Sequence, residues 1–97
     1  MNKSDNQNRL EMLRNQIDKI DAEILEIFCK RFDVVEEIGI CKKEYNVRIL
    51  QMTRWINMLN KRIKSGIDLN LSEQLVDELF QLIHEESMNV QSKIMNT

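Results

Sequence analysis

Hydrophobic side chains recur at steps of three and four along the first half of the chain. Such spacing, kept for about five heptads, indicates one amphipathic helix with an apolar seam, predicted over residues 8–45. At ~1.5 Å per residue this helix is roughly 55 Å long, and the rest of the chain is too short to cover it. A second copy of the chain is the simplest cover, so the pattern predicts a homodimer of packed long helices. The seam consists of Leu10, Leu13, Ile17, Ile20, Ile24, Ile27, Arg31, Val34, Ile38, Cys41 and Tyr45.

A second, shorter stripe predicts a helix over residues 49–65. The sequence YNVR (45–48) separates it from the first helix, because Asn46 favours a turn. Gly66 is predicted to end the second helix in the left-handed conformation, with Lys64 in the last turn. The stripe consists of Ile49, Met52, Ile56, Leu59 and Ile63.

A third stripe predicts a helix over residues 71–93. Asn70 is placed as its N-cap, with Glu73 three residues later as the partner in a capping box. The three helices together predict an all-α fold in a single domain of residues 1–97. The third stripe consists of Leu75, Val76, Leu79, Phe80, Ile83, Val90 and Ile94.

The composition agrees with a helical protein, because the chain has no proline, two glycines and 42% hydrophobic residues. A net charge of −2 gives no footprint for nucleic acid. The opening segment MNKSDNQNR lacks the apolar stretch of a secretory signal, and no apolar run reaches membrane-spanning length, so a cytoplasmic protein is expected. Cys29 and Cys41 are interpreted as free thiols, and His84 has no cysteine or second histidine near it, so neither a metal site nor a cofactor is predicted.

Arg31 is the only charged member of the seam, and a buried guanidinium needs an anionic partner. Two interpretations stay open: a carboxylate of Asp21 or Glu86, or a bound anionic ligand. Lys42 lies three helical turns further on, roughly 16 Å away, and could close the other end of a pocket for a small dianion. Lys42 could equally snorkel from the edge of the seam into water.

Arg14 has the same heptad position as Lys42 but lies roughly 42 Å away along the same helix. Arg14 could reach the pocket of a second chain if the two long helices run antiparallel. The simpler interpretation is a surface arginine that pairs with Asp18 one turn later.

Four further positions carry polar or small residues on predicted helices. Ser87 and Gln91 continue the face of the third stripe, where a glutamine is often a satisfied core amide but also suits a ligand oxygen. Gly39 costs about 1 kcal/mol relative to alanine inside a helix. Close approach of another helix or a ligand explains Gly39, and so does a tolerated accident. Arg54 lies away from the second stripe and is interpreted as facing solvent.

Taken in order, these residues resemble the all-helical (AroQ-type) chorismate mutases. The segment LRNQIDKIDAEILEIFCKRFDVVEEIGICKK is similar to the first helix of that family, TRWINML to the second and ELFQLIHEESMNVQ to the third. The resemblance covers about residues 10–91. It implies an enzyme that rearranges chorismate to prephenate in phenylalanine and tyrosine biosynthesis, built as an intertwined homodimer whose two sites each use both chains.

The resemblance also implies roles for the charged and polar residues of the first and third helices. Arg14 of the partner subunit and Arg31 would bind the carboxylates of the substrate. Lys42 and Gln91 would donate to its ether oxygen. Because a [3,3] rearrangement needs no nucleophile, metal or proton transfer, the chain needs no Ser–His–Asp or Cys–His arrangement.

One corner of the implied substrate-binding site, around residues 51–55, departs from the family pattern. The resemblance places Arg54 in the site, toward a carboxylate or the ring hydroxyl, with Ser87 nearby. A glutamate that holds the ring hydroxyl typically follows this arginine, and an aspartate often precedes it by three residues. Here Trp55 and Gln51 occupy those positions, so this part of the substrate-binding set is altered. Packing of Trp55 in the core is the other interpretation.

The altered corner keeps other functions open. Isochorismate-pyruvate lyases, which form salicylate, share the cationic set and lack this glutamate, and an aminodeoxychorismate mutase could also differ here. An alternative of another class is a helical dimerisation or regulatory module without catalysis.

Overall fold

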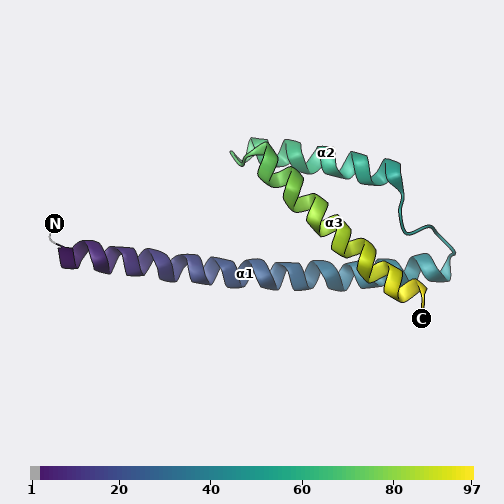
Figure 1. The fold of residues 1–97 in the computed structure, drawn as a ribbon, viewed down its shortest axis with the longest axis horizontal. Helices are drawn as coiled ribbons and strands as arrows, with labels where there is room; N and C mark the ends of the chain where they lie inside the picture. Colours follow the sequence, from purple (N-terminus) through teal and green to yellow (C-terminus); the bar gives the residue numbers. More distant parts are fainter. Residues whose placement is uncertain (1–2) are drawn as a thin grey trace. The chain divides into compact units, whose positions relative to one another are not determined.

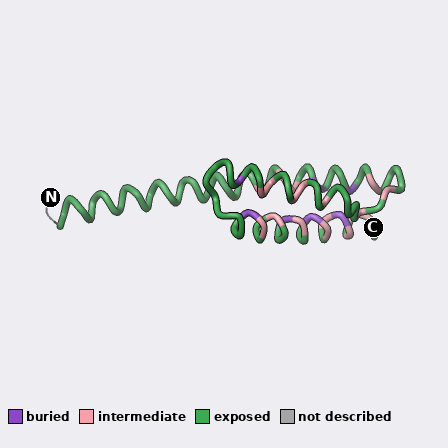
Figure 2. The backbone as a smooth tube through the Cα atoms, turned by 90° about the horizontal axis from the view of Figure 1, so that it is seen from above, coloured by how far each residue is buried: buried purple, intermediate pink, exposed green. Residues whose placement is uncertain are grey.

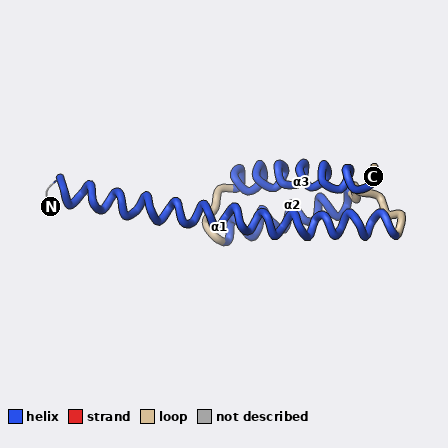
Figure 3. The backbone as a smooth tube through the Cα atoms, turned by 90° about the horizontal axis from the view of Figure 1, so that it is seen from below, coloured by secondary structure: helices blue, strands red, loops and turns tan. Residues whose placement is uncertain are grey.

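The computed structural model describes residues 3–97 and contains three α-helices joined by two loops (Figure 1, Figure 3). Helix α1 spans Lys3–Glu44, α2 spans Met52–Asp68 and α3 spans Glu73–Met95. No strand occurs among the described residues, so the predicted all-α fold with a long first helix is confirmed. The first two residues, which belong to the predicted single domain and to the segment read for a secretory signal, lie outside the described part.

The end of α1 follows from Asn46, as the sequence predicted. Asn46 has a φ of 55°, in the left-handed region that asparagine tolerates better than most residues. The backbone N–H of Val47 donates to the carbonyl of Lys42 at 2.8 Å, and that of Asn46 donates to Lys43 at 3.3 Å. These two bonds form a Schellman motif, which satisfies carbonyls that the end of a helix leaves without partners. Helix α1 therefore ends at Glu44, one residue before the predicted end.

The predicted end of α2 is wrong. The helix runs two residues past Gly66, which is buried and has no positive φ, and Lys64 does not lie in the last turn. Asn70 takes the left-handed conformation instead, with a φ of 63°, and the N–H of Leu71 donates to the carbonyl of Gly66 at 2.9 Å. The absence of a side chain at Gly66 lets α3 pack closely on α2, because a Cβ built there would lie 2.4 Å from Cγ2 of Val76 on α3.

The predicted N-cap of α3 is also wrong. Ser72 caps the helix, and its Oγ accepts a hydrogen bond from the backbone N–H of Leu75 at 2.9 Å. Asn70 is already engaged in ending α2, and Glu73 is the first residue of α3 rather than the third, so the two cannot form a capping box. Because these caps decide the helix ends, α2 and α3 lie two to three residues further along the chain than predicted at 49–65 and 71–93.

The chain divides into two compact units, Met1–Asp33 and Val34–Thr97, and the boundary falls within α1. In the first unit, no residue between 3 and 33 is buried, and most are exposed (Figure 2). The rings of Phe28 and Phe32, one turn apart, stack with centroids 6.5 Å apart. This unit alone therefore has no core.

The second unit contains a small core. Helices α2 and α3 pack against each other in an antiparallel hairpin, and Val35 of α1 joins Val76 and Ile83 of α3 as the buried hydrophobic residues (Figure 1). None of the large side chains among the described residues is fully buried. Two polar residues of α3, Ser87 and Gln91, are as buried as the hydrophobic ones.

The end of α1 lies close to α3 at Gly39. A Cβ built on Gly39 would lie 3.0 Å from Cδ1 of Ile94, 3.3 Å from Cγ of Gln91 and 3.4 Å from its Cα. Close approach of another helix, one of the two explanations open for this glycine, therefore accounts for it.

The predicted apolar seam does not make this contact. Within the second unit, Val34 is 53% and Tyr45 is 72% exposed, whereas the neighbouring Val35 is only 6% exposed. In the first unit Ile17, with 56% of its surface exposed, is typical of the seam. The chain therefore packs α1 against its own α3 through a face beside the seam. Among the described residues, no helix is both long and apolar enough to cross a membrane.

Candidate functional site

Lys42 lies one turn beyond Gly39, at the place where α1 meets α3. Its side chain is half-buried, and its Nζ donates a hydrogen bond to the backbone carbonyl of Ile49 at 2.5 Å. Burial disfavours the charged form, so desolvation lowers the pKa of the Lys42 ammonium below its ordinary value. The ammonium is therefore held by a single backbone acceptor in the loop between α1 and α2, rather than extended into water.

Gln91 faces α1 at the same contact. It is 4% exposed, and its Oε1 is buried with no hydrogen-bond partner among the described residues. Leaving a buried polar atom unpaired costs about 1–3 kcal/mol, so a fold keeps such a group only when it gains something else. A half-turn of the amide exchanges its oxygen and nitrogen, so this position can present an acceptor or a donor. The amide is therefore available for a ligand, and the satisfied-core interpretation does not describe it.

Ser87 lies one turn before Gln91 on α3 and is 6% exposed. Its hydroxyl donates to the backbone carbonyl of Ile83 at 2.8 Å, a common arrangement for a serine inside a helix. The hydroxyl proton of Ser87 is thus engaged within α3.

The first turn of α2 carries the three residues predicted to shape the altered corner. Gln51 is the N-cap residue, but its side chain makes no capping hydrogen bond and is exposed. Arg54 is exposed, as its position off the stripe predicted. Trp55 is half-buried and lies flat on the imidazole of His84, with ring centroids 3.8 Å apart and planes at 15°.

His84 is a residue that the sequence alone did not single out for this site. It was considered only as a metal ligand. Its spacing of three residues before Ser87, and seven before Gln91, places all three on one side of α3. That spacing is the signal that could have found it. Trp55 packs on this histidine, not inside the aliphatic stripe.

Six of the predicted residues lie in the second unit: Lys42, Gln51, Arg54, Trp55, Ser87 and Gln91. Lys42 comes from α1, Ser87 and Gln91 lie on α3, and Trp55 of α2 stacks on His84 of α3. Along α3 the order is the Trp55–His84 stack, the serine and then the glutamine beside α1. Such a row of polar groups, half-buried to buried, can orient a small polar molecule and place a hydrogen bond donor on it.

Arg14 and Arg31 belong to the other unit. Arg14 is exposed and its Nη1 lies 2.9 Å from Oε1 of Glu11, so its carboxylate partner is Glu11 and not the predicted Asp18. Arg31 is half-buried, in contrast to the exposed seam residues on either side of it, Ile27 and Val34. The predicted carboxylate-binding role of both arginines remains a prediction.

A neighbouring lysine fastens the end of α3. Lys43 Nζ donates to the carbonyl of Ile94 at 3.2 Å and also to that of Thr97. A cation at the carboxyl end of a helix satisfies free carbonyls and complements the helix dipole. Lys43 therefore holds the turn of α3 that follows Gln91 against α1.

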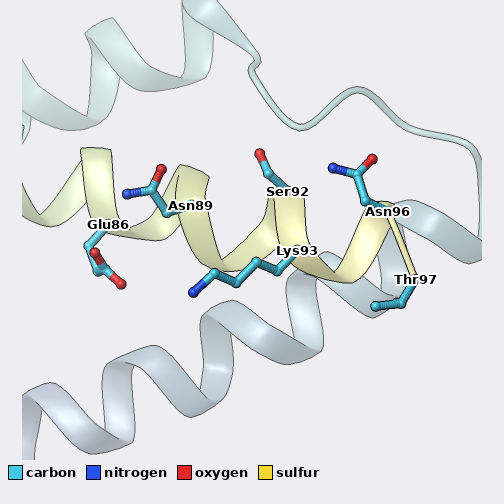
Figure 4. A pocket seen from close by; sticks show the side chains of 6 residues that line it. All are labelled: Glu86, Asn89, Ser92, Lys93, Asn96 and Thr97. Atoms are coloured by element: carbon cyan, nitrogen blue, oxygen red, sulfur yellow. The ribbon is translucent and has the colours of Figure 1, made fainter.

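The structure also has a hollow of about 690 Å³ that none of the predicted residues line (Figure 4). Its walls come from the last turns of α3 and the residues after it. Among the described residues, no group of three or more histidine, cysteine, aspartate or glutamate side chains could hold a metal ion. The hollow is lined by Glu86, Asn89, Ser92, Lys93, Asn96 and Thr97.

Comparison with known proteins shows the family to which the chain is similar. The model of the family described as chorismate mutase type II matches residues 13–92. This match includes the whole of α2, most of α1 and α3, and every predicted site residue.

Several curated proteins are similar to the chain. A bifunctional chorismate mutase/prephenate dehydratase of Buchnera aphidicola is 36% identical over 88 residues, which is 91% of this chain and 23% of that protein. A T-protein of Enterobacter agglomerans is 32% identical over 78 residues, or 80% of this chain and 21% of that protein. The chain thus spans less than a quarter of these two relatives. A 4-amino-4-deoxychorismate mutase of Streptomyces venezuelae is 26% identical over 90 residues, covering 93% of this chain and 87% of that protein.

Proposed function

Because the chain belongs to the type II chorismate mutase family, we propose that it rearranges chorismate to prephenate, in the biosynthesis of phenylalanine and tyrosine. Membership of this family suggests an isomerase. One observation carries the proposal furthest: Gln91 lies against α1 at Gly39, one turn before Lys42, and its buried oxygen has no hydrogen-bond partner among the described residues. A substrate oxygen bound there would give both side chains something to bind.

The proposed chemistry relies on charge that appears during the reaction. As the ether bond of chorismate breaks, negative charge develops on its oxygen. Lys42 would move its Nζ from the Ile49 carbonyl to this oxygen, and the Gln91 amide would donate to the same atom. Donors that bind the developing charge more strongly than the ground state accelerate the reaction, and the partly buried setting strengthens them.

The substrate also needs its two carboxylates held. Arg31 and Arg14 of the partner subunit are proposed for this, since bidentate guanidinium–carboxylate contacts would fold the enolpyruvyl group over the ring. Arg54 would add a further positive charge near a carboxylate or the ring hydroxyl. These contacts would convert a flexible molecule into one near-attack conformer.

An antiparallel homodimer completes this proposal. Its support is the seam of α1, which stays exposed through both units and which the chain's own α3 does not cover. Heptad spacing is the pattern of helices that pack on one another. A second copy is the occupant that presents the same seam, and in an antiparallel pair it would bring Arg14 to the neighbouring site.

The first experiment offers the purified chain chorismate, isochorismate and 4-amino-4-deoxychorismate in separate reactions. Loss of chorismate, followed by ultraviolet absorbance with prephenate identified by chromatography, is the expected result. Salicylate from isochorismate, or turnover of the amino compound alone, would move the function to the corresponding alternative. Two observations favour testing these alternatives. Trp55 stands where a carboxylate is expected, and the chain is similar to an aminodeoxychorismate mutase. No turnover and no binding of any of the three would indicate a non-catalytic helical module.

The second experiment tests whether the site is shared between chains. Arg14→Ala and Lys42→Ala chains are inactive alone if both residues are needed. Mixed by co-refolding, half of the dimers carry one chain of each kind, and one of their two sites is intact. Activity should then return to about a quarter of the unmodified level. If it stays at the level of the single variants, Arg14 does not act on the partner's site.

A further inference from the structure

The first turn of α2 lacks the features that usually hold the start of a helix. The N-cap Gln51 makes no side-chain cap, and the turn contains no acidic residue. Helix α3 has both, with Ser72 as its cap and Glu73 in its first turn. Capping and acidic side chains stabilise the first turn because its N–H groups have no helical partners. Something else must hold the first turn of α2 in place.

The stack of Trp55 on His84 is a contact of α3 with this turn. Trp55 is the fourth residue of α2, and its ring covers a half-buried imidazole in the middle of α3 at 3.8 Å and 15°. Near-parallel rings at this separation fix both the distance and the rotation of the two helices at that level. A further α2–α3 contact at close range, Gly66 against Val76, lies three turns away at the far end of α2.

We propose that the Trp55–His84 stack is a positioning pair, which fixes the first turn of α2 on α3 and thereby sets Arg54 relative to Ser87 and Gln91. His84 would touch no substrate in this arrangement and would act through Trp55 and the backbone of the turn. The expected effect on turnover rests on the proposed function. The fixing of the first turn of α2 does not depend on that function.

The stack also gives the residue at position 55 a role other than binding the ring hydroxyl. An indole can donate one hydrogen bond and accepts none, so Trp55 cannot replace a carboxylate that accepts from a hydroxyl. Its flat surface is used on His84 instead. The guanidinium of Arg54, one residue before, is left as the polar group that this turn offers to the substrate.

The first test measures the turn directly, without substrate. Amide hydrogen exchange of residues 52–58 is compared in the full chain, in His84→Ala and in His84→Phe. We expect protection to fall about tenfold in His84→Ala and to remain in His84→Phe, which keeps an aromatic ring for the stack. Trp55 is the only tryptophan, so its emission reports loss of the stack in the same samples. Glu85→Ala, an exposed neighbour on α3, is the matched control and should change neither. Unchanged protection in His84→Ala would overturn the proposal.

The second test asks whether the stack acts through Arg54. His84→Ala should lower kcat/KM for chorismate about 3- to 10-fold, the range that loss of an aromatic pair gives, and His84→Phe should restore it. In an Arg54→Ala background the same His84→Ala change should cost less than twofold, because the positioned group is gone. Equal losses in both backgrounds would overturn the positioning of Arg54. If no chorismate turnover occurs at all, the proposed function fails, while the exchange experiment still decides whether the stack holds the turn.

Discussion

Helix α1 runs through two regions that differ in what the chain itself covers. Between residues 3 and 33 no residue is buried, whereas the region from 34 to 97 buries Val35 and Gly39 of the same helix against α3. The seam stays exposed in both regions. A single helix therefore carries two separate faces: one that packs within its own chain, and one that stays exposed.

The second region is also unusual in what it buries. Ser87 and Gln91 are as inaccessible as Val76 and Ile83, and the oxygen of Gln91 has no partner in the described part of the chain. A fold selected for stability alone would place apolar side chains there, because an unpaired polar group costs free energy. The two regions therefore differ in kind: the first has no buried residue, and the second buries polar side chains beside apolar ones.

The largest expected effect separates chemistry from assembly within the second region. Lys42→Ala should lower kcat for chorismate ~100–1000-fold, which is the ~2.7–4 kcal/mol that one donor to a developing oxyanion typically supplies. The oligomeric state and the far-ultraviolet circular dichroism spectrum should not change. Lys43→Ala is the matched control: its amine binds the end of α3, and its loss should change kcat less than tenfold. Turnover near the unmodified level in Lys42→Ala would remove this residue from the mechanism.

The next effect breaks the first region. Replacing Ile20 and Ile24 with glutamate places two charges in the seam, and burying unpaired charges costs several kcal/mol each. The dissociation constant of the dimer should rise on the order of a hundredfold or more, as measured by sedimentation equilibrium. Ala22→Glu adds a similar charge to the opposite side of the helix and should have little effect. A double variant that associates as strongly as the parent chain would show that the seam is not the interface.

Particular residues show why part of the fold and of the candidate site could be predicted from the sequence. Periodicity identified three helices, and Asn46 marked the end of the first, because local backbone preferences decide such features. Gly66 was misassigned, since its reason is the side chain of Val76 on another helix and not the local turn. The partner of Trp55 was missed for the same reason: His84 is distant in sequence. Contacts between helices are not encoded in the period of either one.

Gly66 offers a smaller effect, on stability alone. Gly66→Ala would set a Cβ 2.4 Å from Cγ2 of Val76, and such overpacking typically costs about 1–3 kcal/mol, offset by about 1 kcal/mol of improved helix propensity. The net loss should lower Tm by a few degrees in calorimetry at fixed chain concentration. Adding Val76→Ala should relieve the overlap, so that this double variant is less destabilised than the sum of its two single variants. Strict additivity would contradict the contact.

The smallest effect concerns pH and follows from Lys42. Burial lowers the pKa of its ammonium, so the proton that serves as donor is lost at a lower pH than in an exposed lysine. The kcat/KM profile, which reports the free enzyme, should therefore fall on its alkaline side, and Lys42→Arg, whose guanidinium keeps its charge, should shift that fall to higher pH. The pH dependence of stability has the opposite sign, because the unfolded chain binds this proton more tightly than the folded chain does. The contribution of Lys42 to the free energy of unfolding therefore rises with pH between its folded and unfolded pKa values. Activity that falls while urea stability is maintained would assign the alkaline loss to Lys42; a parallel loss of both would assign it to unfolding.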